Sequence, residues 1–296
     1  LLFLVCGTQD QTKKGIYKKA SFKMPFFLET HVKVQKRQVK IQDGILIDDS
    51  KGSSLEADLF LPPNDDVKRP AILFIHGGGW REGDRSQLRG YAILLARLGF
   101  VTLCTSYRLS TEAVWPAQIQ DINCALRYLR THADNLGIDK ERVGVSGNSA
   151  GGHLALMAAT KIKKFGGQGY NNTESSYVKA VCAIYPPARI KKLDNTDPLD
   201  NAFLALMGEE AEQSDYDAAS PINYINKHYV PTMLVHGSKD NVVSLRDSND
   251  LYKKLLKYNI PAEMHIFSEE DHAFDGKNEY GRVVADLQSL FFLKYL

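Results

Sequence analysis

Two patterns of hydrophobic residues divide the chain. Near the N-terminus, apolar and polar residues alternate along residues 32–42 and 54–62. A period of two is typical of a strand with one exposed face, so we expect an antiparallel pair at a sheet edge. Short uninterrupted apolar runs follow, as expected for strands buried on both faces of a parallel sheet. These runs are residues 71–75, 101–107, 142–147, 178–185, 231–237 and 262–267.

Segments with helical spacing lie between these apolar runs. Asp84 and Gln87 have the spacing of a capping box, ahead of a helix that is expected to end near Gly99. Residues 116–137 begin with a proline that suits the first helical turn and end with a glycine. The regular alternation predicts an α/β fold with a mainly parallel sheet and helices on both faces. Further helices are predicted over residues 149–164, 245–259 and 280–296.

Length and composition are those of an ordinary globular protein. The chain has 296 residues, of which 44% are hydrophobic and 24% charged, and a single α/β domain commonly reaches this size. A net charge of +2 gives no electrostatic reason to expect binding of nucleic acid. We predict one domain over residues 31–296. Within it, residues 186–230 are the longest interval between predicted strands and form either a small lid-like insertion or ordinary packing segments.

Residues 1–30 are expected to lie outside this domain, as a signal remnant and a tether. The apolar stretch "LLFLVCG" is too short to span a bilayer and is typical of the end of a secretory signal. Cys6 would suit a lipoprotein signal and would then carry a lipid anchor, although Val5 before it is bulkier than usual. We therefore expect an exported protein: periplasmic, extracellular or attached to the cell surface. A cytoplasmic protein with a frayed end is the alternative.

The strongest chemical signal is a candidate nucleophile. Residues 147–151 read Gly-Asn-Ser-Ala-Gly, which matches G-x-S-x-G, between a predicted strand and a predicted helix. A sharp turn in this context exposes the hydroxyl of Ser149, and the flanking glycines remove side chains that would collide. The following helix directs its positive N-terminal end at the reacting group. The alternative is a glycine-rich helix start that packs closely on the sheet.

A serine hydroxyl needs a base, and the base needs an orienting group. In this architecture the chain order is serine, then acid, then histidine. Asp240 follows the apolar run 231–237, where it could otherwise be a turn or capping residue. His272 follows the run 262–267 and precedes the last helix. We predict that Ser149 is the nucleophile, His272 the general base and Asp240 the carboxylate that orients His272.

A run of glycines, "HGGGW" over residues 76–80, follows the first of the buried apolar runs. Taken alone, it fits either a tight turn or a backbone that binds a negative charge. Together with "YRLS", "GNSAGG", "HGSKD" and "DHAF", it resembles the α/β-hydrolase esterase/lipase family that carries an HGGG(W) oxyanion motif. The resemblance covers roughly residues 50–295. Within that family, "HGGGWREGDRSQ" is most similar to bacterial carboxylesterases of the acetyl xylan/feruloyl esterase type.

This resemblance implies the α/β-hydrolase fold, with a small lid or none, and an oxyanion hole. The N–H groups of Ala150, Gly77 and Gly78 would hold the oxyanion, and a side chain at Gly78 would reduce turnover far more than stability. His76 would brace the loop. Trp80 would either line an acyl or alcohol pocket or pack as a core aromatic residue.

The expected function is a serine carboxylic-ester hydrolase that acts through an acyl-enzyme. Its substrates would be short-chain esters of small molecules or polysaccharides, such as acetyl or feruloyl groups on plant polysaccharides. The mechanism needs no metal and no organic cofactor. An arylformamidase-like amide hydrolase or a peptidase is the alternative, because the same triad serves amide bonds. A binding module without activity is a further alternative, although such proteins usually lose the nucleophile or the histidine.

Overall fold

The computed structural model describes residues 38–48, 54–63, 67–160, 163–166, 173–192 and 198–296. These residues all fall within one compact unit of the chain, Arg37–Leu296. The predicted signal remnant and tether over residues 1–30, with Cys6, lie outside the described residues, as does the domain boundary predicted at residue 31. None of the described helices is both long enough and apolar enough to cross a membrane.

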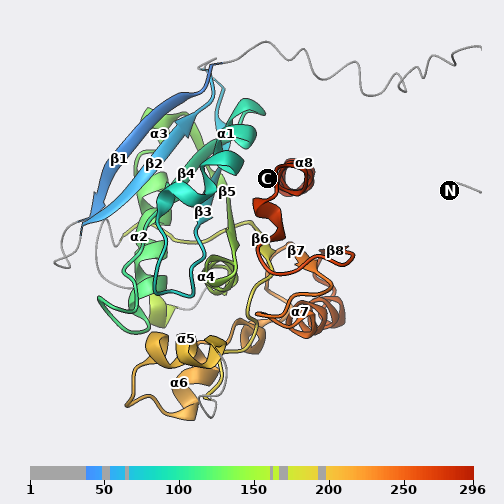
Figure 1. Ribbon diagram of the computed structural model, residues 1–296. Helices are drawn as coiled ribbons and strands as arrows, with labels where there is room; N and C mark the ends of the chain where they lie inside the picture. Colours follow the sequence, from blue (N-terminus) through green and yellow to red (C-terminus); the bar gives the residue numbers. More distant parts are fainter. Residues whose placement is uncertain (1–37, 49–53, 64–66, 161–162, 167–172, 193–197) are drawn as a thin grey trace, which may run out of the picture. The chain divides into compact units, whose positions relative to one another are not determined.

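A mixed sheet of eight strands forms the centre of the described unit (Figure 1). Its spatial order is β1-β2-β4-β3-β5-β6-β7-β8. β2 pairs antiparallel with β1 and β4, and all the other neighbours are parallel. The mainly parallel sheet with an antiparallel N-terminal edge is therefore confirmed. The strands are β1 Lys40–Asp48, β2 Leu55–Leu61, β3 Arg69–Ile75, β4 Val101–Thr105, β5 Ile138–Asn148, β6 Ala180–Ile184, β7 Thr232–Gly237 and β8 Ala262–Phe267.

The first strand starts later than the alternation over residues 32–42 predicts. Residues 38 and 39 lie outside any strand, and residues 32–37 are not described. β1 instead extends to Asp48, where Leu46 and Ile47 continue the chain beside β2. Ile47 is only 2% exposed. Its burial in the core fixes where β1 lies along the sequence. An alternating sequence pattern does not by itself contain that tertiary contact.

Helices cover both faces of the sheet, as predicted. α1 and α8 bury one apolar cluster, which includes Phe74 and Phe292, while α2, α4 and α7 bury the other, which includes Leu73 and Leu154. Fully burying such a side chain stabilises the fold by roughly 1.5–3 kcal/mol. The helices are α1 Arg89–Arg97, α2 Ala117–Thr131, α3 Ala133–Leu136, α4 Ala150–Ala158, α5 Pro198–Met207, α6 Gln213–Ala218, α7 Leu245–Lys257 and α8 Asn278–Tyr295.

The helix boundaries follow the predicted signals in part. The Asp84 carboxylate accepts a hydrogen bond from the backbone N–H of Ser86, 2.6 Å away, and so caps a 3-10 turn that leads into α1. It does not form the predicted box with Gln87. The chain leaves α1 through Gly99, whose φ of 103° suits glycine. Pro116 precedes α2 rather than occupying its first turn.

The interval over residues 186–230 contains α5 and α6, which lie together at the lower end of Figure 1. It is attached to the core through a hydrogen bond of 2.7 Å between the His153 Nε2–H and the carbonyl of Ala219. α5 reaches the cleft that contains Ser149 through Leu199 and Ala202. This interval therefore contributes one wall of the candidate site.

Candidate active site

Ser149 lies on the sharp turn between β5 and α4. Its φ of 53° is in the left-handed region, which residues other than glycine adopt only under constraint. The two flanking glycines supply that constraint. A Cβ at Gly147 would lie 2.3 Å from the carbonyl oxygen of Gly151, and one at Gly151 would lie 2.0 Å from that of Ile75. The steric reason for both glycines, predicted from the motif, is therefore confirmed.

The structure brings Ser149, His272 and Asp240 together from the ends of three different strands. His272 Nε2 lies 2.9 Å from Ser149 Oγ, and His272 Nδ1 lies 2.7 Å from Asp240 Oδ2. Because a carboxylate only accepts, Nδ1–H donates to Asp240, which leaves Nε2 free to accept the serine proton. The Asp240 side chain is 0% exposed and that of His272 is 16% exposed. The base is therefore accessible, and its orienting partner is buried.

The Asp240 carboxylate is surrounded by donors. Its Oδ1 accepts hydrogen bonds from the backbone N–H groups of Val242 and Val243, at 3.0 and 2.8 Å. Burial alone would raise the pKa of Asp240, but hydrogen bonds from His236, His272 and Val243 outweigh it and hold the pKa well below its ordinary range. Asp240 is therefore negatively charged at neutral pH.

A second carboxylate, Asp271, joins the acid loop to the histidine loop. Its Oδ1 accepts from the backbone N–H of His272, at 2.7 Å, and from that of Asn241, at 3.0 Å. Its Oδ2 accepts from Asn241 Nδ2 at 3.0 Å. Since Asn241 follows Asp240 directly, these bonds hold the two loops in register. Asp271 begins the "DHAF" motif, but the motif gave it no role, because its partner Asn241 lies 30 residues away.

Tyr185 packs against the ring of His272 and was also missed by the sequence analysis. The two ring centroids are 4.5 Å apart. The Tyr185 hydroxyl donates to Asp275 and accepts from Asn148 Nδ2, at 3.1 Å. Asp275 also accepts from the hydroxyl of Tyr91, at 2.7 Å. Burial, and then the charge of Asp275, raise the pKa of Tyr185 well above its ordinary value, so the hydroxyl stays protonated.

The glycine loop runs directly beside the nucleophile. A Cβ built at Gly77 would lie 3.3 Å from the Cβ of Ser149. Gly78 and Gly79 have φ angles of 99° and 58°. Within the described residues, the N–H groups of Gly77, Gly78 and Ala150, the predicted oxyanion donors, and that of Gly79 donate to no protein acceptor. They are available to an anion at the cleft, and the assignment of particular N–H groups to an oxyanion hole stays a prediction.

The expectation that a side chain at Gly78 would reduce turnover far more than stability is wrong. A Cβ at Gly78 would lie 2.1 Å from the carbonyl oxygen of Glu82, on a backbone that already has a positive φ. Any side chain there would displace the main chain, so substitution of Gly78 would destabilise the loop itself. Glycine is required at this position because the loop's own backbone, at Glu82, lies against it.

His76 braces the loop, as predicted. It is 2% exposed, and its ring stacks on Tyr107 with centroids 4.3 Å apart. Burial lowers the pKa of His76 from 6.5 to about 4, so the ring is neutral at physiological pH. His76 Nδ1 lies 2.8 Å from the Gly77 carbonyl, to which it donates. The Tyr107 hydroxyl lies 3.2 Å from the His76 carbonyl.

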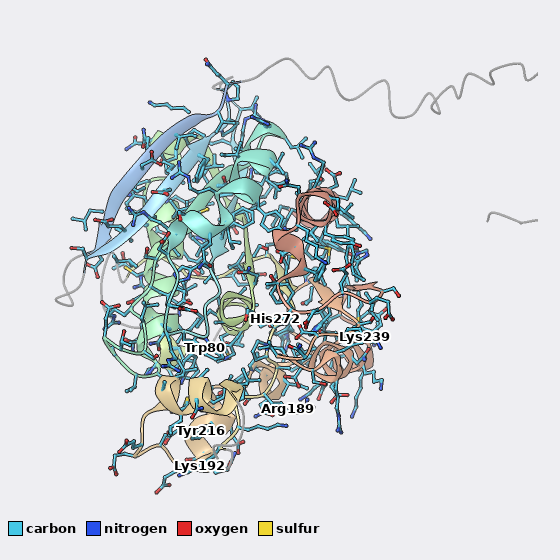
Figure 2. All side chains as sticks on the ribbon, in the orientation of Figure 1. Trp80, Arg189, Lys192, Tyr216, Lys239 and His272 are labelled. Carbon is cyan, nitrogen blue, oxygen red and sulfur yellow. The ribbon has the colours of Figure 1, made fainter. Side chains whose placement is uncertain are left out.

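The candidate site opens into a cleft of about 690 Å³. Trp80 lines it and is also a core residue. The indole is 1% exposed and packs edge-on against His153, with centroids 5.2 Å apart. Figure 2 labels Trp80 and His272, which both border this cleft. Trp80 is therefore a core residue that also borders the cleft, and its contact with an acyl or alcohol group stays a prediction. Other lining residues are Arg81, Glu82, Gln87, Thr111, Asn148, Tyr185, Pro187, Leu199, Ala202, Val242 and Ala273.

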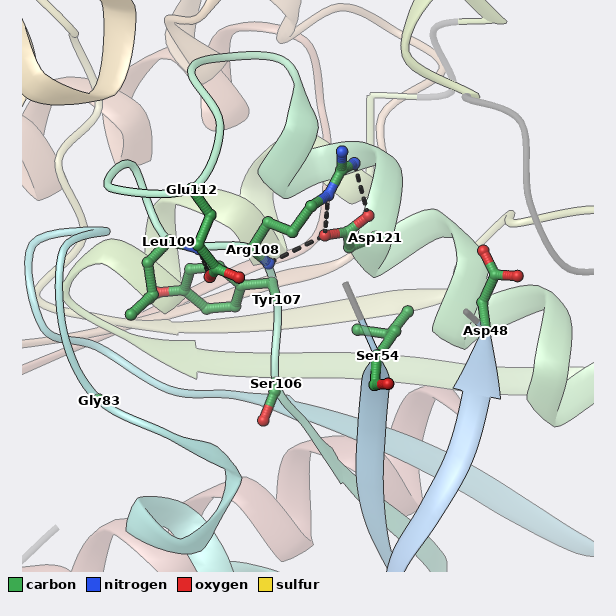
Figure 3. A pocket seen from close by; sticks show the side chains of 10 residues that line it. Asp48, Ser54, Gly83, Ser106, Tyr107, Arg108, Leu109, Glu112 and Asp121 are labelled. Carbon is green, nitrogen blue, oxygen red and sulfur yellow. Dashed lines mark hydrogen bonds and ion pairs between the residues drawn. The ribbon is translucent and has the colours of Figure 1, made fainter. Parts of the chain in front are cut away.

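A smaller pocket, of about 190 Å³, contains none of the triad residues (Figure 3). Arg108 and Asp121 form part of its wall. Arg108 donates to the Asp121 carboxylate through Nε, at 2.9 Å, through Nη2, at 2.8 Å, and through its backbone N–H, at 2.9 Å. These bonds attach the segment after β4, which carries Tyr107, to α2. Through Tyr107 they support the ring of His76.

This fold and the arrangement of Ser149, His272 and Asp240 are those of an α/β hydrolase. The family model that matches the chain is BD-FAE, over residues 57–255. The chain therefore belongs to the BD-FAE family.

Esterases are among its curated relatives. Esterase LipC of Mycobacterium tuberculosis is 30% identical over 197 residues, which cover 63% of this chain and 48% of LipC. The carboxylic ester hydrolase LipM of the same organism, described as probable, is 26% identical over 79% of this chain and 56% of LipM. Arylacetamide deacetylase of Oryctolagus cuniculus is 35% identical over 48% of this chain and 35% of that protein. The chain spans about half the length of LipC and LipM.

Solved structures share the fold. A truncated form of a carbohydrate esterase from gut microbiota has a TM-score of 0.74 and 24% identity, over 86% of this chain and 96% of that chain. A propionate-bound esterase of Thermogutta terrifontis, Est2, has a TM-score of 0.74 and 24% identity, over 89% of this chain and 96% of that chain. The α/β-hydrolase fold predicted from the motifs is therefore confirmed.

Proposed function

We propose that this protein is a serine carboxylesterase that hydrolyses short-chain esters through an acyl-enzyme. The observation that carries the proposal is the contact of 2.9 Å between Ser149 Oγ and His272 Nε2, with Nδ1 held by the buried Asp240. A serine hydroxyl beside an oriented neutral imidazole is an activated nucleophile. Membership of the BD-FAE family, whose enzymes act on acetyl and feruloyl esters, supports the same activity.

In the first half-reaction, Ser149 Oγ attacks the ester carbonyl while His272 Nε2 takes the hydroxyl proton. The carbonyl oxygen gains a negative charge, which the N–H groups of Ala150 and of the glycine loop would stabilise. The C–O bond to the alcohol then breaks, and His272 returns its proton to the departing oxygen. Asp240 stays ionised throughout and stabilises the imidazolium while it exists.

In the second half-reaction, water replaces the alcohol. His272 takes a proton from the water as it attacks the acyl carbon. Collapse of the tetrahedral intermediate returns that proton to Ser149 Oγ and releases the acid. This half-reaction uses only groups of this chain, the acyl group and one water molecule.

The proposed substrates are acetyl or feruloyl esters of plant polysaccharides. The BD-FAE family supports both acyl groups, and the propionate-bound and butyrate-bound Thermogutta esterase supports small acyl groups in this fold. The cleft also has charged and polar lining groups, among them Arg81, Glu82 and Gln87, which could hydrogen-bond a sugar.

Hydrolysis of p-nitrophenyl acetate by the wild type and by Ser149→Ala tests the activity. We expect the variant to lose at least about a thousandfold in kcat/KM, since it removes the nucleophile. Equal rates would refute the proposal. Release of acetate from acetylated xylan and of ferulate from feruloylated arabinoxylan then compares the two polysaccharide substrates.

Amide hydrolysis is a second candidate, supported by the similarity to arylacetamide deacetylase. The triad serves both bonds, so the site geometry does not separate them. The ratio of kcat/KM for phenyl acetate to that for acetanilide, measured on the same preparation, decides between them. A ratio below one would favour the amide, and N-formyl aniline would extend the test to formamides.

A further inference from the structure

His236, on β7, contacts the same Asp240 oxygen as the triad histidine. Its Nε2 lies 3.2 Å from Asp240 Oδ2 and 2.9 Å from the carbonyl oxygen of Val243. Its Nδ1 lies 2.8 Å from the hydroxyl of Ser248 on α7. The side chain is 0% exposed. We propose that His236 is a positioning residue for the reaction, which acts on His272 through Asp240.

The contacts determine where His236 carries a proton. Both neighbours of Nε2, the Val243 carbonyl and the Asp240 carboxylate, are acceptors, so Nε2 carries hydrogen in either charge state of the ring. The Ser248 hydroxyl can accept from Nδ1 or donate to it. A fully buried imidazole with partners at both nitrogens has no freedom to rotate. His236 therefore presents one fixed N–H, which is shared between the Val243 carbonyl at 2.9 Å and Asp240 Oδ2 at 3.2 Å.

With this donor, Asp240 receives four N–H groups. Val242 and Val243 donate to Oδ1, while His236 and His272 share Oδ2. Two consequences follow for the reaction. The carboxylate cannot rotate away from His272 without breaking several bonds. In addition, the charge on Oδ2 is divided between two imidazoles, which limits how strongly Asp240 stabilises the protonated form of His272.

The proposal rests on the proposed function, and its test uses the full chain. His236→Phe removes the donor and keeps the ring volume, while His236→Gln keeps an amide N–H. Gln288→Leu is the matched control. Gln288, on α8, is also buried and accepts a hydrogen bond from a hydroxyl, that of Ser146 at 2.7 Å, but it makes none of the triad bonds.

For His236→Phe we expect kcat/KM on p-nitrophenyl acetate to fall by about tenfold to a hundredfold, mainly through kcat. Because Oδ2 then concentrates its charge on His272, the acid limb of the kcat/KM profile moves to higher pH. His236→Gln should recover part of both changes. Gln288→Leu should lower the melting temperature and leave the limb in place. An acid limb that is identical in the wild type and His236→Phe, or no recovery in His236→Gln, would overturn the proposal.

A measurement on the wild type needs neither a folded variant nor a substrate. In a chain labelled with ¹⁵N-histidine, we expect His236 to be protonated at Nε2 at neutral pH, in slow exchange with water. A His236 that lacks a proton on Nε2 would overturn the assignment of the donor. Failure of ester hydrolysis in the wild type would instead overturn the proposed function and leave this result standing.

Discussion

The loop after β3 and the loops after β7 and β8 meet at Ser149, yet they are held in place by different forces. The first loop depends on backbone conformation, with positive φ angles at Gly78 and Gly79, and on a neutral His76. The other two depend on hydrogen bonds between charged and titratable side chains, above all those of Asp240. The first loop should therefore respond to added volume, and the others to a changed charge or proton position.

Asp240→Asn should have the largest effect. The amide would present a donor where His272 Nδ1–H now finds an acceptor, so the imidazole would no longer hold the tautomer that accepts the Ser149 proton. We expect kcat to fall by about 10⁴-fold, measured on p-nitrophenyl acetate.

Asp271→Asn is the matched control, because an amide oxygen can still accept from the backbone N–H groups of Asn241 and His272. Its loss should stay below about tenfold, since both backbone bonds remain possible. Similar losses of kcat in the two variants would show that the reaction does not depend on the charge of Asp240 more than on that of Asp271.

Acid should weaken the fold through two neutral histidines. Burial lowers the pKa of His76, beside the glycine loop, and that of His153, on α4, from 6.5 to about 4. As the pH falls from 6.5 to 4, the unfolded chain binds protons at these rings and the folded chain does not. Stability is therefore complete above pH 6.5 and decreases below it, by about 3 kcal/mol for each ring at pH 4.

Urea unfolding between pH 7 and pH 4 measures this slope. His76→Gln should flatten it. A slope that is the same in wild type and His76→Gln would contradict the neutral, buried state of His76.

Gly77→Ala and Gly79→Ala should separate turnover from stability. A Cβ at Gly77 would lie 3.1 Å from the Asn148 carbonyl oxygen and 3.3 Å from the Ser149 Cβ, so the loop must shift slightly away from the nucleophile. We expect a loss of about tenfold to a hundredfold in kcat with little change in melting temperature.

At Gly79 the nearest atom to a new Cβ is 3.7 Å away, on Ala202, but φ is 58°. Gly79→Ala should therefore cost about 1 kcal/mol of stability and preserve most of the turnover. Equal effects of the two variants on kcat and on melting temperature would remove the distinction between the two positions.

Much of the fold could be predicted because its signals are local. Runs such as 71–75 and 262–267 became strands within two residues of their predicted limits. The burial expected for both faces is present in β3, whereas it is wrong for β8, which lies at the edge of the sheet and is only half-buried. The first strand could not be placed, because burial of Ile47 defines its position. Asp271 and Tyr185 were missed for a related reason: nothing near them in the sequence indicates the loop or ring that they contact.

The sequence by itself determined the elbow at Ser149 and the glycine loop, because both depend on short-range spacing and backbone sterics. The order of serine, acid and histidine followed from the architecture that the motifs predict. Only the tertiary structure decided which side chains hold these groups. Ser149 and His272 are 123 residues apart, and the donors around Asp240 include a histidine four residues before it that no spacing rule distinguished. Hydrogen bonds between buried groups act over about 3 Å, so only the packed fold can specify them.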